Sequence, residues 1–288
     1  MTSTRALVRG IRPRQWSKNI LVLAAPVAAG IAFQPRAVIE TGAAVLAFIL
    51  ASSGVYLVND TVDVEADRAH PTKRLRPVAA GELSAREAST AAVVLLAGGL
   101  AVSALLGWQL FVVVALYEAV QILYCLVMQN VPVVELLSVA FGFLLRAIAG
   151  GVATGVELSP WFLVAVGSGS LFVAAGKRYS ELLLAEDATP AIRPVLARYT
   201  PSYLRFAWML SAGVLVTTYA LWSATVGQAE PNPWTIVSIL PVAVAVLRYA
   251  RKIDAGDAGE PEEVILGDRV TLLLVTAWAA CFIGAVYL

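Results

Sequence analysis

The residues from Asn59 to Asp67 carry the clearest chemistry in this sequence. Asp60, Asp63 and Asp67 follow directly on a long apolar run. At about 100° per residue, these three aspartates fall within about 60° of one another on a helix. Carboxylates that converge repel one another unless a cation joins them, and Mg²⁺ prefers such hard oxygen ligands. We therefore predict that Asp60, Asp63 and Asp67 are catalytic residues that hold Mg²⁺ together with a substrate diphosphate.

A short basic run follows the aspartates. Lys73, Arg74 and Arg76 provide three cations in four residues. Lys and Arg commonly bind the phosphate oxygens that a metal leaves uncovered, so we predict that they contact substrate phosphate, together with Asn59. His70 is the only histidine in the chain, so it cannot define a metal site; it either touches a phosphate or caps the loop. The plainer alternative for the whole segment is a solvated loop of mixed charge.

The composition is that of a membrane protein. Of 288 residues, 59% are hydrophobic and 14% are charged, and the mean hydropathy is +0.77. Soluble domains usually carry about 25% charged residues, so this chain is solvated largely by lipid. The two cysteines, Cys125 and Cys281, lie inside apolar runs and are expected to be reduced packing residues.

Nine apolar stretches are long enough to cross a bilayer as helices, which takes about 20 mostly apolar residues. The first follows a basic segment and could pass for a signal peptide, but eight further stretches behind it favour an uncleaved helix. We predict an all-α polytopic membrane protein with one transmembrane catalytic domain over residues 1–288. The predicted spans are 19–34, 37–58, 87–107, 109–128, 132–153, 160–183, 203–226, 233–250 and 268–288.

Lys and Arg residues gather on one side of these spans. If the spans alternate in direction, 19 of the 21 lie on the side of the N-terminus, and the exceptions are Arg36 and Arg146. Cytoplasmic loops carry such an excess. We therefore expect the N-terminus, the active site and two charged loops, about 59–86 and 177–205, in the cytoplasm. The C-terminus would lie outside the cell inner (plasma) membrane.

Three further basic residues are candidates for contact with substrate phosphate. Arg14 and Lys18 are four residues apart at the cytoplasmic mouth of the first span, where they also fit an ordinary interfacial anchor beside Trp16. Arg146 lies inside the fifth span, where an unpaired charge costs at least about 2.5–3.5 kcal/mol. It should face a polar cavity, with either Glu118 or a substrate phosphate as its partner.

The acidic run and the basic run together resemble a known motif. NDxxDxxxD followed by DRxHxxxxxRPxAxG, from Asn59 to Gly81, is similar to the first aspartate motif of the UbiA superfamily of intramembrane prenyltransferases. The resemblance implies nine transmembrane helices around a central cavity and Mg²⁺ as the cofactor.

Typical members of that superfamily carry a second aspartate motif at the end of span six. Here the chain reads Gly176-Lys177-Arg178-Tyr179-Ser180-Glu181, with Glu181 as the only acid. This departure favours direct phosphate contacts from Lys177 and Arg178, with Tyr179 and Glu181 as further candidates. Lys177 and Glu181 are spaced to pair with each other, which would leave Arg178 free.

Three segments resemble one branch of the superfamily, the enzymes that transfer phosphoribose to decaprenyl phosphate. They are Arg12 to Asn19, Gly142 to Gly151 and Gly176 to Leu182. One departure is Gln129, five residues after the candidate site residue Tyr124, where the pattern of that branch has a lysine. One phosphate contact is therefore expected to differ.

The resemblance implies transfer of 5-phosphoribose from phosphoribosyl diphosphate to a polyprenyl (decaprenyl) phosphate, with release of diphosphate. This would be a step towards the lipid-linked arabinose donor of cell-wall arabinan. The lipid phosphate is already anionic at neutral pH, so the reaction needs no general base, but cations must offset repulsion between the two substrates.

Two alternatives stay open: prenyl transfer from a prenyl diphosphate to an aromatic or lipophilic acceptor, and membrane transport. The absence of a second aspartate motif argues against the first. The second is disfavoured because the charges gather at one membrane face rather than near the midplane. Nothing in the sequence indicates a nucleic-acid partner. It leaves open the polyprenyl length, the number of Mg²⁺ ions and the oligomeric state, and it is compatible with a homo-oligomer.

Overall fold

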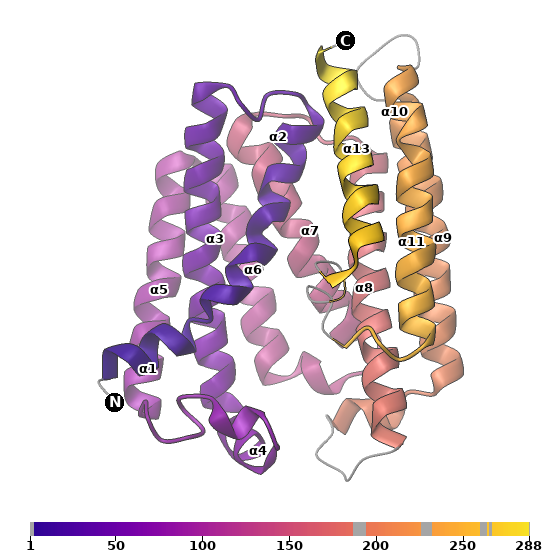
Figure 1. Ribbon diagram of the computed structural model, residues 1–288. Helices are drawn as coiled ribbons and strands as arrows, with labels where there is room; N and C mark the ends of the chain where they lie inside the picture. Colours follow the sequence, from indigo (N-terminus) through magenta and orange to yellow (C-terminus); the bar gives the residue numbers. More distant parts are fainter. Residues whose placement is uncertain (1–2, 187–193, 226–231, 260–263, 265–266, 288) are drawn as a thin grey trace. The chain divides into compact units, whose positions relative to one another are not determined.

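The computed structural model describes residues 3–186, 194–225, 232–259, 264 and 267–287, and every regular element in these ranges is a helix (Figure 1). The chain forms two compact units. Unit 1 comprises Met1–Ser138 and Leu145–Glu157, and unit 2 comprises Val139–Leu144 and Leu158–Leu288. Each unit is described by itself.

Unit 1 is built on the long helix α3, which packs against α5 and α6 and against the 3₁₀ helix η1. Apolar residues run along most of α3, and Pro35 begins it, because proline has no N–H to leave unpaired at a helix start. The elements of this unit are α1 (Ser3–Gly10), η1 (Pro13–Leu23), α2 (Ala24–Ala28), α3 (Pro35–Val62), α4 (Val64–Ala69), η2 (Lys73–Leu75), α5 (Ala85–Leu106), α6 (Trp108–Leu126), η3 (Met128–Asn130) and most of α7 (Val134–Thr154).

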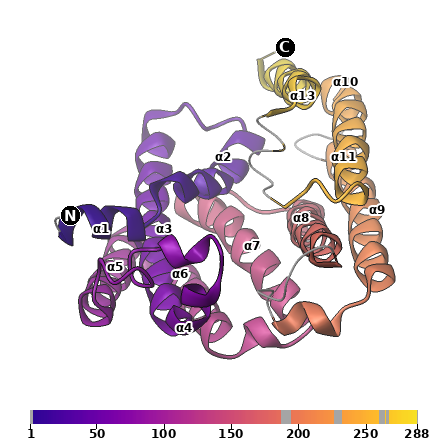
Figure 2. The same cartoon turned by 60° about the horizontal axis from the view of Figure 1, so that its bottom comes forward.

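One end of unit 1 gathers α1, α4 and the loop that follows α4 (Figures 1 and 2). Arg9 on α1 donates to Glu82 at 2.7 Å and to the carbonyl of Leu75 at 2.9 Å, so α1 is tied to that loop. Ser84 and Glu87 form a capping box at the start of α5, which fixes where the loop ends. A small core underlies these contacts and comprises Ala6, Leu57, Val78, Leu83, Ala88 and Ala92.

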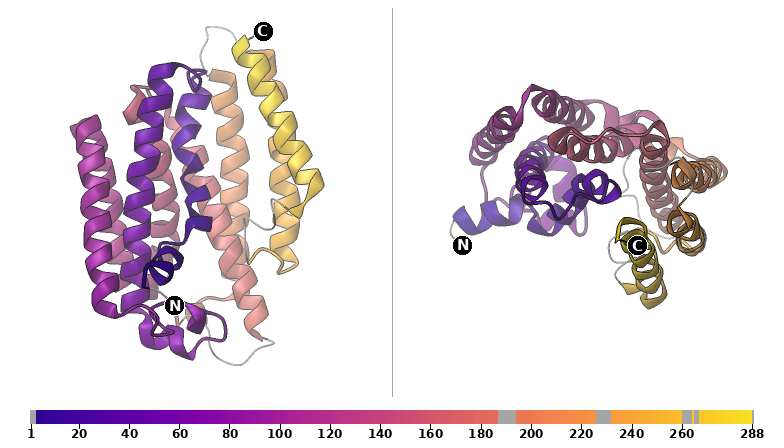
Figure 3. Two further views of the ribbon diagram at one scale, coloured as in Figure 1. Left: turned by 60° about the vertical axis from the view of Figure 1, so that its left-hand side comes forward. Right: turned by 90° about the horizontal axis from the view of Figure 1, so that it is seen from above.

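Unit 2 is a group of helices in which α8 packs against α9, and α11 packs against α8, α9 and α13 (Figure 3). Close approach of α8 to α11 requires glycine at Gly176, because a Cβ atom there would overlap Ile253. Trp222 on α9 stacks on Phe282 of α13. The elements are α8 (Pro160–Glu186), η4 (Pro194–Arg198), α9 (Pro201–Thr225), α10 (Pro233–Val237), α11 (Ile239–Asp254) and α13 (Arg269–Tyr287).

Seven segments in the described part of the chain are long and apolar enough to cross a bilayer, so this is a multi-pass membrane protein. They agree with predicted spans two to eight within a few residues. The predicted count of nine spans and the central cavity stay predictions, since α13 contributes only a shorter apolar stretch, Arg269–Ala285. The seven segments are Pro35–Val62, Ala85–Leu106, Trp108–Leu126, Val134–Thr154, Pro160–Leu184, Pro201–Thr225 and Pro233–Asp254.

Two predicted boundaries are wrong. The first apolar stretch was placed at 19–34, but helical structure there runs from Pro13 to Ala28. It stops because Gly30 takes a positive φ of 69°, which a right-handed helix cannot continue. The second charged loop, predicted at 177–205, is helical up to Glu186, because the apolar pattern of α8 continues past its charged residues. Residues 187–193 of that loop lie outside the described residues.

Candidate active site

The aspartates of the first motif lie where α3 ends and α4 begins. Asp60 is in the last turn of α3, Asp63 separates the two helices, and Asp67 is on α4. The backbone hydrogen bonds from Asp63 N to Asn59 O and from Asp67 N to Asp63 O continue the helical pattern across the break. The helical register predicted from the sequence is therefore kept, and Asp60 and Asp67 come to lie two turns apart on one side.

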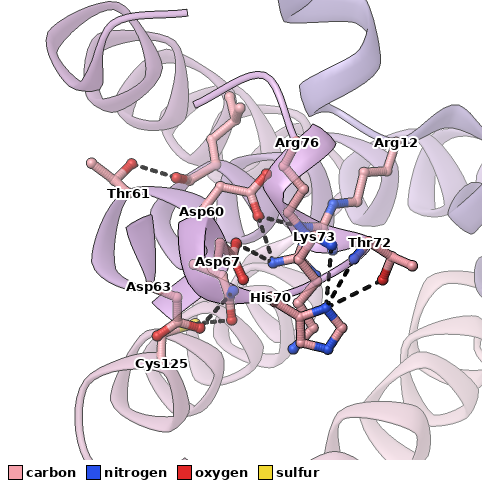
Figure 4. A network of polar contacts seen from close by, with 12 residues as sticks. Arg12, Asp60, Thr61, Asp63, Asp67, His70, Thr72, Lys73, Arg76 and Cys125 are labelled. Atoms are coloured by element: carbon pink, nitrogen blue, oxygen red, sulfur yellow. Dashed lines mark hydrogen bonds and ion pairs between the residues drawn. The ribbon is translucent and has the colours of Figure 1, made fainter. Parts of the chain in front are cut away.

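Two guanidinium groups neutralise this pair of aspartates (Figure 4). Arg76 donates to Asp67 Oδ2 at 2.6 Å and to Asp60 Oδ1 at 3.2 Å. Arg12 also pairs with Asp60 Oδ1. Asp60 and Asp67 are 1% and 2% exposed, and a buried carboxylate without a counter-charge would cost several kcal/mol. Arg76 therefore pairs with both aspartates, and its predicted contact with substrate phosphate stays a prediction.

Arg12 is a site residue that the sequence prediction missed. It lies in the stretch from Arg12 to Asn19, where only Arg14 and Lys18 were predicted to contact substrate phosphate. Its guanidinium stands over the ring of Tyr56, 4.9 Å from the centroid, which adds a cation–π contact to its ion pair. Burial lowers the pKa of Arg12 and Asp60 opposes that shift; a guanidinium stays charged at neutral pH in either case.

The segment that carries Arg12 is fixed to α3. Trp16 donates its indole N–H to the Ser53 hydroxyl at 3.1 Å and to the carbonyl of Ile11 at 3.3 Å. Trp16 therefore attaches the start of η1 to α3, in addition to any role at the membrane interface. Arg14 is exposed and makes no ion pair within the described part of the chain, and the predicted phosphate contacts of Arg14 and Lys18 stay predictions.

Asp63 has different partners from the other two aspartates. Its Oδ2 accepts from Asn59 Nδ2 at 3.0 Å, and its Oδ1 accepts from Gln129 Nε2 at 3.1 Å. Gln129 also donates to the carbonyl of Cys125 at 2.8 Å, and the Cys125 thiol approaches Asn59 Oδ1 at 3.6 Å. Asp63 is thus oriented by two neutral amides, one from α3 and one from η3, which follows α6. Gln129, noted in the sequence as a departure, supplies one of them.

Replacing Gln129 by leucine is expected to raise the KM for the diphosphate donor about tenfold, because Asp63 loses one of its two fixed donors, a loss of about 1–1.5 kcal/mol. Lysine at position 129 should keep the KM within about threefold, since an ammonium can still reach Asp63. The matched control is Gln121→Leu on α6, where the amide contacts only the carbonyl of Ser138 among the described residues. Initial rates in detergent would measure all three; an unchanged KM in Gln129→Leu would contradict the role given to Gln129.

Some of the remaining polar and charged residues of this segment contact other protein groups, and others are exposed. His70 Nδ1 accepts the backbone N–H groups of Thr72 and Lys73, each at 3.3 Å, which is the capping role that the sequence left open. Glu65 points away from the aspartates, since its carboxylate pairs with Arg68 and is largely exposed. Arg74 is exposed and makes no ion pair within the described ranges. The phosphate contacts predicted for Lys73 and Arg74 stay predictions.

Arg146 on α7 is buried in unit 1 among polar and aromatic side chains. Its Nε donates to Asn19 Oδ1 at 2.8 Å, and its Nη2 donates to the Tyr117 hydroxyl at 2.9 Å. The guanidinium also lies over the rings of Tyr117 and Phe48 at 4.8 and 5.7 Å. Gly150, one turn further along α7, lets η1 approach, because a Cβ atom there would overlap the carbonyl of Val22. These contacts favour a structural role for Arg146, with Asn19 and Tyr117 as its partners in place of the predicted Glu118.

The second basic cluster lies on α8 in unit 2. Arg178 donates to Glu181 Oε2 at 2.9 Å, while Lys177 Nζ is 4.0 Å from Glu181 Oε1. The predicted Lys177–Glu181 pair is present. Arg178 is not left free, however, because it lies three residues from Glu181 on the same helix and pairs with the same carboxylate. Tyr179 is buried, and its hydroxyl accepts from Arg205 on α9 at 2.6 Å. Tyr124 on α6 is buried in unit 1.

The sequence profile of the UbiA prenyltransferase family matches residues 23–267, which include the aspartates, Arg76 and the α8 cluster. The chain belongs to the UbiA prenyltransferase family. The family assignment agrees with the fold. A solved structure of a UbiA homologue from Archaeoglobus fulgidus bound to GPP and Mg²⁺ superimposes with a TM-score of 0.73 and 17% identity, covering 98% of this chain and 100% of that one.

Two curated relatives are much more similar in sequence. A decaprenyl-phosphate phosphoribosyltransferase from Corynebacterium glutamicum is 47% identical over 98% of this chain and 87% of the relative. A decaprenyl-phosphate phosphoribosyltransferase from Mycobacterium tuberculosis is 50% identical over 97% of this chain and 94% of the relative. The similarity therefore extends over nearly the full length of both chains.

The UbiA homologue solved with Mg²⁺ raises the question of whether the residues here fit that ion. Asp60 Oδ2 is buried and has no hydrogen-bond partner, so one hard oxygen is available next to Asp67. Mg²⁺ usually takes one or two carboxylates and completes its shell with water and substrate phosphate. In the described residues, no group of three His, Cys, Asp or Glu could hold a metal by itself. Asp60 and Asp67 thus fit a shared site, and Asp63 as a third ligand stays a prediction.

Proposed function

We propose that this chain transfers a 5-phosphoribosyl group from phosphoribosyl diphosphate to a polyprenyl phosphate, with decaprenyl phosphate as the expected lipid. The observation that carries the proposal is the 47–50% identity, over at least 97% of this chain, to relatives that are decaprenyl-phosphate phosphoribosyltransferases. The chemistry of the first motif supports it, because carboxylates and arginines gathered at one helix end suit a metal-bound diphosphate.

The reaction breaks the bond between ribose C1 and a diphosphate oxygen and forms a bond from that carbon to an oxygen of the lipid phosphate. Negative charge develops on the departing diphosphate, and groups fixed in advance to receive it lower the barrier. Mg²⁺ on Asp60 and Asp67 would neutralise part of that charge. Arg76 lies beside both carboxylates and can donate to the diphosphate oxygens. Since the lipid phosphate attacks as an anion, no proton has to be removed.

The enzyme must also bind the acceptor, polyprenyl phosphate, although both substrates are anionic and repel each other. Lys177 and Arg178 replace the carboxylates that prenyltransferases of this family have at the end of span six. We assign these two cations to an anionic group, with Glu181 orienting Arg178. Two clusters rich in basic residues suit two anionic substrates better than a single prenyl diphosphate with a neutral acceptor.

The position of the protein in the membrane is part of the proposal. We place the N-terminus, the first motif and the α8 cluster on the cytoplasmic side of the inner membrane, because 19 of 21 Lys and Arg residues fall there when the spans alternate. The finer topology has nine spans, with η1 and α2 contributing to the first, α13 forming the last and the C-terminus outside. The water-soluble donor then arrives from the cytoplasm, and the lipid acceptor from the bilayer.

The products distinguish this activity from prenyl transfer. Purified protein in detergent, given Mg²⁺, decaprenyl phosphate and phosphoribosyl diphosphate labelled in the ribose, is expected to form a labelled lipid that partitions into butanol. Omitting the lipid acceptor, or adding EDTA, should abolish the product. Consumption of a prenyl diphosphate with an aromatic acceptor, without any labelled lipid, would show that the chain transfers prenyl groups instead.

A further inference from the structure

The carboxylates that fit a metal ion are already neutralised in this structure by protein cations. Two guanidinium groups, those of Arg12 and Arg76, face two carboxylates, those of Asp60 and Asp67. Their formal charges cancel within the group. Any ion that enters alone therefore gives this group of four side chains a net charge.

The two sides of this group differ in their freedom to move. Asp60 is 1% exposed and sits in a helical turn, whereas the side chains of Arg12 and Arg76 are 24% and 23% exposed. A long arginine side chain can keep its stem in place and redirect its charged end. The carboxylates are thus the fixed partners, and the guanidinium groups are the ones that can turn towards an incoming anion.

The backbone holds Arg12 beside Asp60. Arg12 has φ 51° and ψ 65°, a left-handed conformation that a residue other than glycine adopts rarely, and Pro13 follows it. Such a conformation costs of order 1 kcal/mol and persists only where surrounding contacts fix it. Here those contacts are the ion pair with Asp60 and the ring of Tyr56. A conformation held in this way favours a role for the Arg12 side chain in the site.

Charge balance limits what the group can accept. A divalent cation that entered alone would add two positive charges next to two guanidinium groups in a largely buried place, where repulsion is weakly screened. A diphosphate that entered alone would meet two buried carboxylates. When both enter together, the metal takes the carboxylates, including the unpartnered Asp60 Oδ2, and the released guanidinium groups take the diphosphate oxygens.

We propose that Arg12 is a further diphosphate-binding residue of the donor site. With Arg76, it occupies the cation position at Asp60 in the resting enzyme, and it turns to the diphosphate when the metal arrives. Metal and diphosphate then bind as a unit, and each raises the affinity for the other by the same factor. This rests on the proposed function only in requiring a divalent metal and a diphosphate, and it does not depend on which group is transferred.

The test measures binding with Mn²⁺ as the metal and inorganic diphosphate as the anion, on the full chain in detergent. The electron paramagnetic resonance signal of free Mn²⁺ gives the affinity, with protein-free titrations correcting for Mn²⁺ bound by diphosphate in solution. The wild type is expected to bind Mn²⁺ weakly alone and at least about tenfold more tightly with diphosphate, equivalent to about 1.4 kcal/mol of coupling.

Arg12→Gln and Arg76→Gln should reverse this pattern. Each should bind Mn²⁺ alone more tightly than the wild type does, by about threefold to tenfold, and should gain less from diphosphate. Arg12→Lys keeps the charge and should stay close to the wild type in Mn²⁺ binding without diphosphate. The matched control is Arg68→Gln on the same segment, where the arginine pairs with the exposed Glu65; its Mn²⁺ binding should equal that of the wild type.

Two results would overturn the inference. One is wild-type protein that binds Mn²⁺ as tightly without diphosphate as with it. The other is unchanged Mn²⁺ affinity in both glutamine variants, each shown to be folded by size-exclusion chromatography. If Arg12→Gln does not fold, Arg12→Lys provides the test. In this variant the increase in Mn²⁺ affinity caused by diphosphate should be smaller than in the wild type, because an ammonium lacks the guanidinium fork. An increase equal to that of the wild type would contradict the role of Arg12. Formation of labelled phosphoribosyl lipid without this coupling would leave the proposed function intact.

Discussion

Asp60→Asn is expected to lower turnover by at least about 10²–10³-fold, the usual cost of removing a group that stabilises charge in the transition state. Asp60 is the carboxylate that contacts both Arg12 and Arg76, and its second oxygen has no partner. Asparagine keeps the shape and removes the charge that a metal needs. Formation of labelled lipid, followed at saturating donor and acceptor, measures the effect.

The same substitution is expected to destabilise unit 1. Two guanidinium groups would face a neutral amide, and breaking a buried ion pair costs about 3–5 kcal/mol. The loss should be smaller here, because both arginine side chains are about a quarter exposed and can turn to water. Activity therefore has to be measured on protein whose melting temperature in detergent is known.

A double variant separates the two effects. Asp60→Asn combined with Arg12→Gln removes one positive charge along with the negative one, so the melting temperature should recover in part, while turnover should stay at the level of Asp60→Asn. Recovery of turnover together with stability would mean that Asp60 acts only on folding, and the metal assignment would fall.

Arg146→Met is expected to give the largest loss of stability among the variants considered. The substitution is similar in length but leaves Asn19 and the Tyr117 hydroxyl without their donor. Each unsatisfied buried polar group costs about 1–3 kcal/mol, so a loss of about 2–5 kcal/mol is expected. Asn19 Nδ2 already has no hydrogen-bond partner, and the site cannot relax easily because Gly150 brings η1 against α7.

The donor KM decides between the two readings of Arg146. If the arginine is structural, the folded fraction of Arg146→Met should keep a KM for phosphoribosyl diphosphate within about threefold of the wild type. Thermal melting in detergent and initial rates at a temperature well below the transition measure the two effects on one preparation. A KM raised tenfold or more in protein with an unchanged melting temperature would instead support the phosphate contact predicted from the sequence.

The sequence was sufficient for conclusions that depend on local pattern. Apolar runs of about 20 residues predicted spans two to eight within a few residues, because no backbone polar group can stay unpaired in lipid. The spacing of Asp60 and Asp67 correctly placed them on one helical face, since helical periodicity continues across Asp63. The run from Asn59 to Gly81 resembled the UbiA family, to which the chain belongs.

Other conclusions required the tertiary structure. Arg12, far from Asp60 in sequence, reaches it only because Trp16 and the packing of η1 on α3 bring the N-terminal segment there. Gln129 holds Asp63 because α6 ends beside it.

Because Arg146 lies inside an apolar span, the sequence shows only that its charge needs polar partners. Those partners, Asn19 and Tyr117, come from other segments of the chain. Local pattern determines where helices form and which residue types they present. Which charges meet depends on how the helices pack, and no spacing along the chain encodes that.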